Sequence, residues 1–331
     1  MDTDTTDCES PRRVSRRAWP SERHTEPMLL RDIARATLAS LVHLLKTVKV
    51  GHRVADSRIA AWICGEGAVV ARLRGGSQAI VLANDYNGRC LYLWGDSDPR
   101  ITAVVDAVLR EGDTALDIGA NLGVVGLFAA HRVGSTGTVH FFEPQPLAAS
   151  CLRTSLLVNR YSSAHLHECA LSDSSGFATM TILDPGNYGM TTLAAPTEEP
   201  AAPLRTIRVR TEPAGEFIAS LGCAKVTMIK IDVEGHEPII LASMRKWLAE
   251  AHPAVILFEC YLNNLAFQEH DSVRILSEIG YEFYGFDMKP LWKTRLIAVN
   301  ERQHPAGRDF VAVLWHELDE DRRNAIQAMV N

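Results

Sequence analysis

Residues 115–123 decide the fold, and they read Ala115-Leu-Asp117-Ile-Gly119-Ala-Asn121-Leu-Gly123. Leu116 and Ile118 continue a short apolar strand, and the two glycines permit a tight turn with close backbone approach. Residues 124–133 (VVGLFAAHRV) are apolar enough to form a packed helix. A strand that runs into a glycine turn and then into a helix is how α/β enzymes bind nucleotide-type cofactors. The sequence therefore predicts such a pocket at this turn.

The turn departs from the dinucleotide-binding pattern. Gly-x-Gly-x-x-Gly requires a second glycine where Asn121 stands, and Val124 and Val125 follow Gly123. This departure disfavours an NAD-dependent oxidoreductase, which stays as an alternative. The order acidic residue, x, Gly, x, small or polar residue, x, Gly instead resembles the first motif of class I S-adenosylmethionine-dependent methyltransferases.

Two later segments fall where a doubly wound sheet would place them. In Val139-His-Phe-Phe-Glu143-Pro144 a second strand ends in an acid 26 residues after Asp117, which suits a carboxylate that accepts both hydroxyls of a ribose. An exposed strand end before a proline is the other interpretation of Glu143. The second segment is Met228-Ile-Lys230-Ile-Asp232-Val-Glu234-Gly235-His236-Glu237. In this order the three segments resemble the FkbM-type family of methyltransferases, over roughly residues 84 to 315.

This resemblance implies an α/β fold with a Rossmann-like, seven-stranded, mostly parallel sheet flanked by helices. It also implies S-adenosylmethionine as methyl donor and a hydroxyl on a sugar, lipid or polyketide-like product as acceptor. The residues that match the cofactor-binding motifs are Asp117, Gly119, Asn121, Gly123 and Glu143. In such a pocket the amides from Gly119 to Gly123 and the start of the next helix hold the methionine carboxylate of the donor, and Asp117 lies near its ammonium group.

Ser172 and Asp173 follow the third strand, where this fold contacts adenine. A turn-forming aspartate before Ser-Ser-Gly is the other interpretation of Asp173. The segment Gly95–Pro99 fits a Gly-x-x-Glu-Pro pattern of the family only loosely and receives no role.

The fourth strand carries the candidate catalytic residues. A lysine in an apolar parallel strand costs several kcal/mol unless it is paired, so we expect an ion pair between Lys230 and Asp232 at the cleft, with a purely structural pair as the alternative. Methyl transfer requires that the acceptor oxygen be aligned and its proton removed. Asp232 and His236 are the best candidates for the base, although His236 could simply begin a helix. Glu234 and Glu259 are orienting groups or second-choice bases.

A metal-assisted alternative remains open. Mg²⁺ between Asp232 and Glu259 could hold the acceptor oxygen as a Lewis acid, since hard cations prefer such carboxylates. Two acids do not establish a metal site, and we predict no dedicated one.

Composition agrees with an enzyme. The 331 residues are 47% hydrophobic, which is enough for one large α/β core with an appendage. A net charge of −6 argues against nucleic acid as the main partner. The seven cysteines are scattered without a Cys-x-x-Cys pair, which favours reduced thiols in a cytoplasmic protein.

The chain is expected to divide into four parts. Residues 1–28 are polar and charged, and we expect a disordered tail with neither a signal peptide nor a membrane span. Residues 29–98 hold an amphipathic helix over 30–48 and a small β-rich appendage. Residues 99–318 form the methyltransferase domain, and residues 319–331 a C-terminal helix or tail. The amphipathic helix most simply covers the core, but it could also contact a membrane surface or a second subunit, and the oligomeric state stays open.

The region between residues 68 and 95 reads as three short strands in hairpins, the last being Cys90–Trp94. From residue 114 strands and helices alternate regularly, which indicates a parallel α/β sheet. Two strands near 177–183 and 206–210 form an inserted antiparallel pair. They are separated by a loop over Asp184–Pro203 that is either a lid or a disordered tip.

Rival functions come from other classes. A nucleic-acid or protein amine methyltransferase usually carries an Asn/Asp-Pro-Pro-Tyr/Phe turn after the fourth strand, whereas this chain has Asp232-Val-Glu-Gly, which favours a hydroxyl acceptor. A non-catalytic protein that binds adenosylmethionine is the remaining alternative. Loop residues that could contact the acceptor are Tyr188, Tyr261, Asn263, Asn264, Tyr284 and Trp292.

Overall fold

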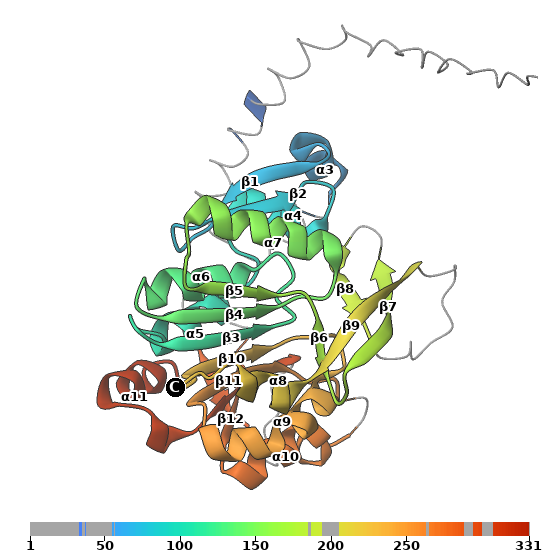
Figure 1. The fold of residues 1–331 in the computed structure, drawn as a ribbon. Helices are drawn as coiled ribbons and strands as arrows, with labels where there is room; N and C mark the ends of the chain where they lie inside the picture. Colours follow the sequence, from blue (N-terminus) through green and yellow to red (C-terminus); the bar gives the residue numbers. More distant parts are fainter. Residues whose placement is uncertain are drawn as a thin grey trace, which may run out of the picture.

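An eight-stranded sheet forms the centre of the molecule, in the order β13-β12-β14-β11-β10-β3-β4-β5 (Figure 1). The computed structural model describes residues 57–184, 187–193, 205–262, 265–287, 294–299 and 307–330, together with residues 33, 34, 37 and 55. The adjacent parallel strands are β3 (Thr114–Ile118), β4 (Thr138–Phe142), β5 (Ala164–His167), β10 (Met228–Ile231) and β11 (Val255–Glu259). The antiparallel pairings involve β12 (Glu282–Phe286), β13 (Leu296–Ala298) and β14 (Asp309–Val313).

The predicted Rossmann-like α/β fold is confirmed, but the sheet is mixed and has eight strands instead of seven. The additional strand, β13, has three residues, Leu296–Ala298. A segment of this length is too short to show the two-residue alternation by which a strand is recognised in a sequence.

Helices cover both faces of the sheet. On one face lie α5 (Pro99–Val108), α6 (Val124–Val133) and α7 (Pro146–Asn159), and on the other α8 (Ala214–Ser220), α9 (Glu237–Ala251) and α10 (Asp271–Ile279). Alternate strand residues enter the two apolar cores. In β3, Ala115 packs in the first core, while Leu116 and Ile118 pack in the second. This double coverage explains why the parallel strands are apolar almost throughout.

The carboxyl ends of the parallel strands meet at one edge of the sheet. In the register of β3 and β10, Asp117 lies opposite Lys230, and Ile118 opposite Ile231. The turn after β3 and the turn after β10 are therefore neighbours. This edge is where open α/β sheets bind their ligands.

An appendage precedes the sheet, and its last element corrects the prediction. It contains α3 (Arg58–Cys64), the antiparallel pair β1 (Ala68–Arg72) and β2 (Gln78–Leu82), and α4 (Tyr86–Trp94). The expected third strand Cys90–Trp94 is thus the second half of a helix. The Asp85 carboxylate accepts a hydrogen bond from the Gly88 amide at 2.7 Å and starts this helix. Helix α4 can pack closely on β2 because a Cβ at position 88 would lie 1.9 Å from the Leu82 carbonyl oxygen.

A second sheet, β6-β9-β7-β8, stands on the side toward which the parallel strands point (Figure 1). Its strands are β6 (Ala170–Ser172), β7 (Gly176–Asp184), β8 (Asn187–Thr192) and β9 (Arg205–Pro213). The predicted antiparallel pair corresponds to β7 and β9. Part of the predicted loop Asp184–Pro203 is the strand β8, so this segment continues the sheet where we expected a lid or a disordered tip.

Some predictions fall outside the described residues. The tail 1–28 and most of the amphipathic helix 30–48 are among them, as are Asn263, Asn264 and Trp292. The C-terminal segment contains a helix, α11 (Glu320–Gln327), in which Arg322 donates a hydrogen bond to the Val108 carbonyl at 2.7 Å. Among the residues that the structure describes, no helix is long and apolar enough to cross a bilayer.

Candidate active site

The glycine turn after β3 forms the floor of the site. Gly119 and Gly123 have φ of 75° and 81°, a region that favours glycine, and Asn121 between them has φ of 50°. A Cβ at Gly119 would lie 2.0 Å from the Asp232 carbonyl oxygen. The turn after β3 and the turn after β10 therefore come together only because residue 119 has no side chain. Val124 starts α6 directly behind them.

Glu143, at the end of β4, is buried against the same turn. Its Oε2 accepts a hydrogen bond from the Asn121 amide at 2.6 Å, and its Oε1 accepts one from the Gln145 amide at 2.7 Å. Burial raises the pKa of Glu143 to about 7, against these two hydrogen bonds. Each carboxylate oxygen keeps acceptor capacity for a further donor, which is what a ribose diol would supply.

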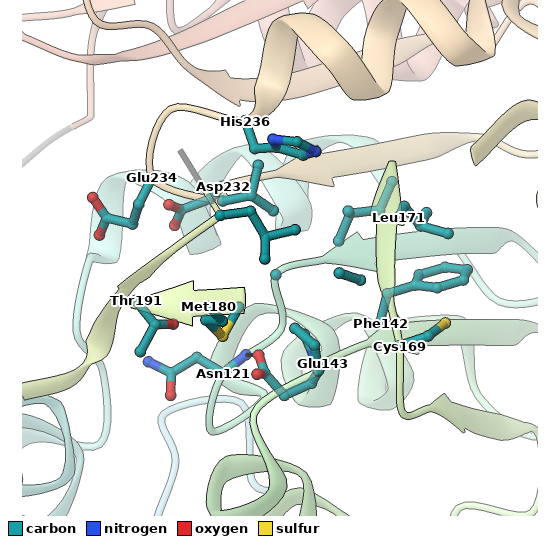
Figure 2. A pocket seen from close by; sticks show the side chains of 16 residues that line it. Asn121, Phe142, Glu143, Cys169, Leu171, Met180, Thr191, Asp232, Glu234 and His236 are labelled. Carbon is teal, nitrogen blue, oxygen red and sulfur yellow. Dashed lines mark hydrogen bonds between the residues drawn. The ribbon is translucent and has the colours of Figure 1, made fainter. Parts of the chain in front are cut away.

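Two cavities open on this edge of the sheet. The first is narrow, about 50 Å³, and lies between Glu143, Leu171, Met180 and His236 (Figure 2). The second measures about 300 Å³ and lies between the glycine turn, α5 and the ends of β10 and β11. Gly119, Asn121, Asp232 and Glu234 line both cavities. This shared wall is the place where a ligand bound in one cavity would meet a ligand bound in the other.

The two predicted adenine contacts, Ser172 and Asp173, have different surroundings. Ser172 is buried, and its Oγ lies 3.0 Å from His236 Nε2 beside the first cavity. Asp173 is exposed and accepts a hydrogen bond from Ser174 Oγ at 2.9 Å, as a turn-forming aspartate does. Neither residue lines a cavity directly, whereas the preceding Leu171 does. Their contact with adenine stays a prediction.

Lys230 is the electrostatic centre of the site. Its Nζ donates to the Gly119 carbonyl at 2.7 Å and lies 3.5 Å from Asp232 Oδ2, so the predicted ion pair is present. A second ion pair joins Nζ to Asp117 Oδ1 at 3.4 Å. Burial lowers the pKa of Lys230, but Asp232 and Asp117 outweigh it and raise the pKa overall. The ammonium group therefore stays charged and fixes the glycine turn to β10.

Asp117 is buried beneath α6 and lines neither cavity. Its Oδ2 accepts a hydrogen bond from the Gly126 amide at 2.8 Å. Burial raises the pKa of Asp117, while Lys230 opposes the rise. The structure thus brings Asp117 to Lys230 and to the first turn of α6; its predicted contact with the ammonium group of the donor stays a prediction.

Three carboxylates converge at the shared wall. Oxygen atoms of Asp232, Glu234 and Glu259 all lie within 4.8 Å of one another. Glu259 Oε2 is buried and has no hydrogen-bond partner among the described residues. Burial and the neighbouring Asp232 and Glu234 raise the pKa of Glu259 to about 9. Glu234 has φ of 54°, and Tyr261 donates a hydrogen bond to its Oε2 at 2.5 Å.

His236 takes a place different from that of the carboxylates. It is the residue before α9, and its buried ring lies 3.0 Å from Ser172 Oγ. Burial lowers the pKa of His236. The neighbouring Glu237 does what a capping side chain does: it accepts hydrogen bonds from the Val233 amide at 2.8 Å and the Gly235 amide at 3.0 Å. Sequence reasoning had not singled out Glu237, although an acid in the first helical turn is the usual signal.

Sequence reasoning also missed Asp96, Asp98 and Asp309, which line the second cavity. Asp96 accepts a hydrogen bond from Thr102 Oγ1 at 2.8 Å, and burial raises its pKa. The loose Gly-x-x-Glu-Pro match at Gly95–Pro99 was the signal for the first two. Asp309 begins β14, which pairs antiparallel with β11 so that Asp309 lies opposite Glu259. Only the strand direction reveals this proximity.

The fold and the site together define a class I S-adenosylmethionine-dependent methyltransferase. The glycine turn before α6 and the buried acid at the end of β4 carry groups that suit the methionine carboxylate and the ribose of adenosylmethionine. A family model described as "Methyltransferase FkbM domain" matches residues 117–288, more than half of the 331 residues. The chain belongs to this FkbM methyltransferase family, and its cofactor is S-adenosylmethionine.

Individual relatives are distant. The chain is 28% identical over 221 residues to the 31-O-demethyl-FK506 methyltransferase FkbM of Streptomyces tacrolimicus, covering 56% of this chain and 79% of that protein. Among solved structures, the precorrin-6y C5,15-methyltransferase of Geobacter metallireducens matches with a TM-score of 0.37 and 13% identity, over 65% of this chain and 88% of that one. A putative rRNA methylase of Clostridium thermocellum matches with a TM-score of 0.37 and 13% identity, over 64% of this chain and 91% of that one.

Proposed function

We propose that the protein transfers a methyl group from S-adenosylmethionine to a hydroxyl of a sugar, a glycolipid or a polyketide-like small molecule. The observation that carries this proposal is the position of Asp232, which lines both cavities. A base at that junction stands between a donor in the first cavity and an acceptor in the second. The name of the relative from Streptomyces tacrolimicus, 31-O-demethyl-FK506 methyltransferase, is in keeping with an oxygen acceptor.

The donor would be held by residues of the glycine turn and its neighbours. The amides between Gly119 and Gly123, together with the positive end of α6, suit the methionine carboxylate. Glu143 suits the ribose diol, and Leu171 and Met180 give the first cavity apolar walls for a base. When bound, the cofactor supplies a methyl group that is already activated on a sulfonium, so the chain needs only to align the acceptor and take its proton.

Asp232 is the preferred base. Its side chain is 46% exposed, and its Oδ2 lies 3.5 Å from Lys230 Nζ, which orients it. Glu259, with its pKa raised to about 9, is protonated near neutral pH and so donates a hydrogen bond more readily than it accepts a proton. His236 is the second candidate, but its ring faces Ser172. Glu234 and Glu259 are then orienting groups around the acceptor.

The charge of the second cavity supports an acceptor without phosphate groups. Its acidic lining residues are Asp96, Asp98, Asp232, Glu234, Glu259 and Asp309. A phosphodiester backbone would be repelled by this lining. A neutral polyol or a cationic acceptor would not be repelled by these carboxylates.

Binding and transfer need separate tests. Calorimetric titration with S-adenosylhomocysteine, with NAD as parallel control, is expected to give saturable one-to-one binding of the former alone; binding of NAD alone would overturn the proposal. Transfer of labelled methyl from S-adenosylmethionine is then measured on a panel of sugar, glycolipid and macrolide hydroxyls. Binding without transfer to any of them would favour the non-catalytic alternative.

The role of Asp232 has its own test. Asp232→Asn is expected to bind S-adenosylhomocysteine within about threefold of the unmodified protein while losing about 10²- to 10⁴-fold in rate, the usual contribution of a general base. Asp271→Asn is the matched control, because Asp271 is an exposed aspartate at the start of α10 that lines neither cavity. Full activity of Asp232→Asn would remove Asp232 from the mechanism.

A further inference from the structure

A second group of ligating side chains lies at the edge of the sheet opposite the cavities. Nitrogen or oxygen atoms of His252, His316 and Glu317 all lie within 4.8 Å of one another. His252 ends α9, and the other two residues belong to the short 3-10 helix η2 (Trp315–Glu317) that follows β14. Because Val255 pairs with Val313, the starts of the parallel strands and the end of β14 meet at this edge. We propose that these three side chains form a zinc site.

The ligand types and their spacing fit zinc. Two imidazoles and one carboxylate are a ligand set that Zn²⁺ uses in proteins, with a water completing the tetrahedron. His252 Nδ1 and His316 Nε2 each lie 3.8 Å from Glu317 Oε1. In a tetrahedral site, with bonds of about 2.0 to 2.1 Å, ligand atoms stand about 3.4 Å apart. Both distances to Glu317 Oε1 exceed this value by about 0.4 Å, and the two histidine nitrogen atoms lie within 4.8 Å of each other, so side-chain adjustment at the helix end would bring the three atoms onto one ion.

Two features hold the ligands in place. Lys225 Nζ donates to Glu317 Oε2 at 3.2 Å, which leaves Oε1 turned toward the histidines. Groups that orient a ligand in this way are typical partners of metal sites. His252 has φ of 46° and ψ of 58°, a left-handed conformation at a helix end where glycine or asparagine is usual. This conformation sets the direction in which the His252 ring leaves the end of α9.

The site would connect two elements whose other ends border the cavities. Helix α9 begins at Glu237, next to the turn of Asp232 and Glu234, and β14 begins at Asp309 in the second cavity. An ion at the opposite edge would hold the end of α9 against the segment after β14. Zinc is therefore expected to stabilise the fold without touching the reacting groups.

The test uses the full chain, stripped of metal with a chelator and then dialysed. Calorimetric titration with Zn²⁺ is expected to show saturable binding. Titration with Co²⁺ is expected to give the visible absorption of a cobalt ion with nitrogen and oxygen ligands. Zinc at about a hundred times its Kd should raise Tm by about 5 °C. His316→Ala and Glu317→Gln should each weaken this binding by about tenfold or more. His131→Ala, which removes an exposed histidine of α6, should leave the binding unchanged.

Other metal-binding groups require a second comparison, since the chain has twelve histidines and a cluster of acids at the active site. Ions held by the acidic cluster should be lost in Glu259→Gln and kept in His316→Ala. In His252→Asn the new residue tolerates the left-handed backbone conformation but lacks the imidazole. A loss of zinc binding in this variant can therefore be separated from misfolding. An absence of saturable zinc binding, or equal binding in His316→Ala, Glu317→Gln and the unmodified protein, would overturn the proposal.

Discussion

Lys230 Nζ lies 3.4 Å from Asp117 Oδ1 on the neighbouring strand, and the two side chains are only 11% and 3% exposed. The buried ammonium group of Lys230 is tolerated because the register of β3 and β10 fixes Asp117 opposite it. The pair also positions the donor turn, because the same ammonium group donates to the Gly119 carbonyl at 2.7 Å.

Removal of one member of this pair is expected to destabilise the fold strongly. Lys230→Met leaves the Asp117 carboxylate buried without its cation, at a cost of about 3 to 5 kcal/mol in the free energy of unfolding. The double variant Asp117→Asn with Lys230→Met removes both charges and should recover part of that loss. Urea denaturation of the two variants measures the difference. Equal stability of the single and double variants would show that the charge of Asp117 is not the cause.

The turn itself can be tested with two glycines that have similar backbone conformation. Gly119 and Gly222 have φ of 75° and 67°, but a Cβ at Gly222 meets nothing within 4 Å, whereas one at Gly119 meets the Asp232 carbonyl oxygen at 2.0 Å. Gly222→Ala should lower the free energy of unfolding by about 1 to 2 kcal/mol, which is the cost of placing alanine in the left-handed conformation. Gly119→Ala should cost more and should also abolish the binding of S-adenosylhomocysteine. Calorimetry and thermal melts on the pair separate backbone strain from close approach.

The candidate residues whose position in the fold could be predicted from the sequence are local. The glycine turn, Glu143 and the segment Lys230–Glu237 each stand in one continuous stretch, where a strand ends and a turn begins, so their types and order were enough to place them at the carboxyl edge of the sheet; their roles stay predictions. Asp309 could not be predicted in this way, because its approach to Glu259 depends on the antiparallel direction of β14. The same limit applies to α4: the apolar residues of Cys90–Trp94 suit a strand as well as a helix, and the choice depends on Asp85 and on the contact of Gly88 with β2.

Cofactor affinity is expected to depend on pH through Glu143. The pKa of Glu143 in the folded protein, about 7, is above its ordinary value of 4.5, so its contribution to stability is complete below pH 4.5 and is lost as pH rises through 7. Ribose hydroxyls donate to the ionised carboxylate and favour that form. The affinity for S-adenosylhomocysteine should therefore rise by about tenfold from about pH 6 to about pH 8, with proton release on binding near the lower value.

Glu143→Gln is the control for this pH dependence. Its amide cannot ionise, so the affinity should be weaker and nearly constant over the same pH range. Calorimetry in two buffers of different ionisation enthalpy measures both the affinity and the released protons. A pH dependence that survives in Glu143→Gln would assign it to another group of the site, such as Asp309, whose pKa burial and Asp232 raise to about 6.

Glu259 distinguishes a base mechanism from a metal-assisted one. With its pKa raised to about 9, Glu259 carries a proton near neutral pH, and glutamine resembles that form in size and charge. If Asp232 acts as base without a metal ion, Glu259→Gln should keep its activity within about threefold, and EDTA should have no effect.

If Mg²⁺ binds between Asp232 and Glu259, the ion must displace the proton on Glu259, because a carboxylate binds a hard cation in its ionised form. Methyl transfer would then fall by at least about 10²-fold in Glu259→Gln and in EDTA, and added Mg²⁺ would restore only the chelated protein. We expect the first result, since the proton on Glu259 already offsets the repulsion among the three carboxylates.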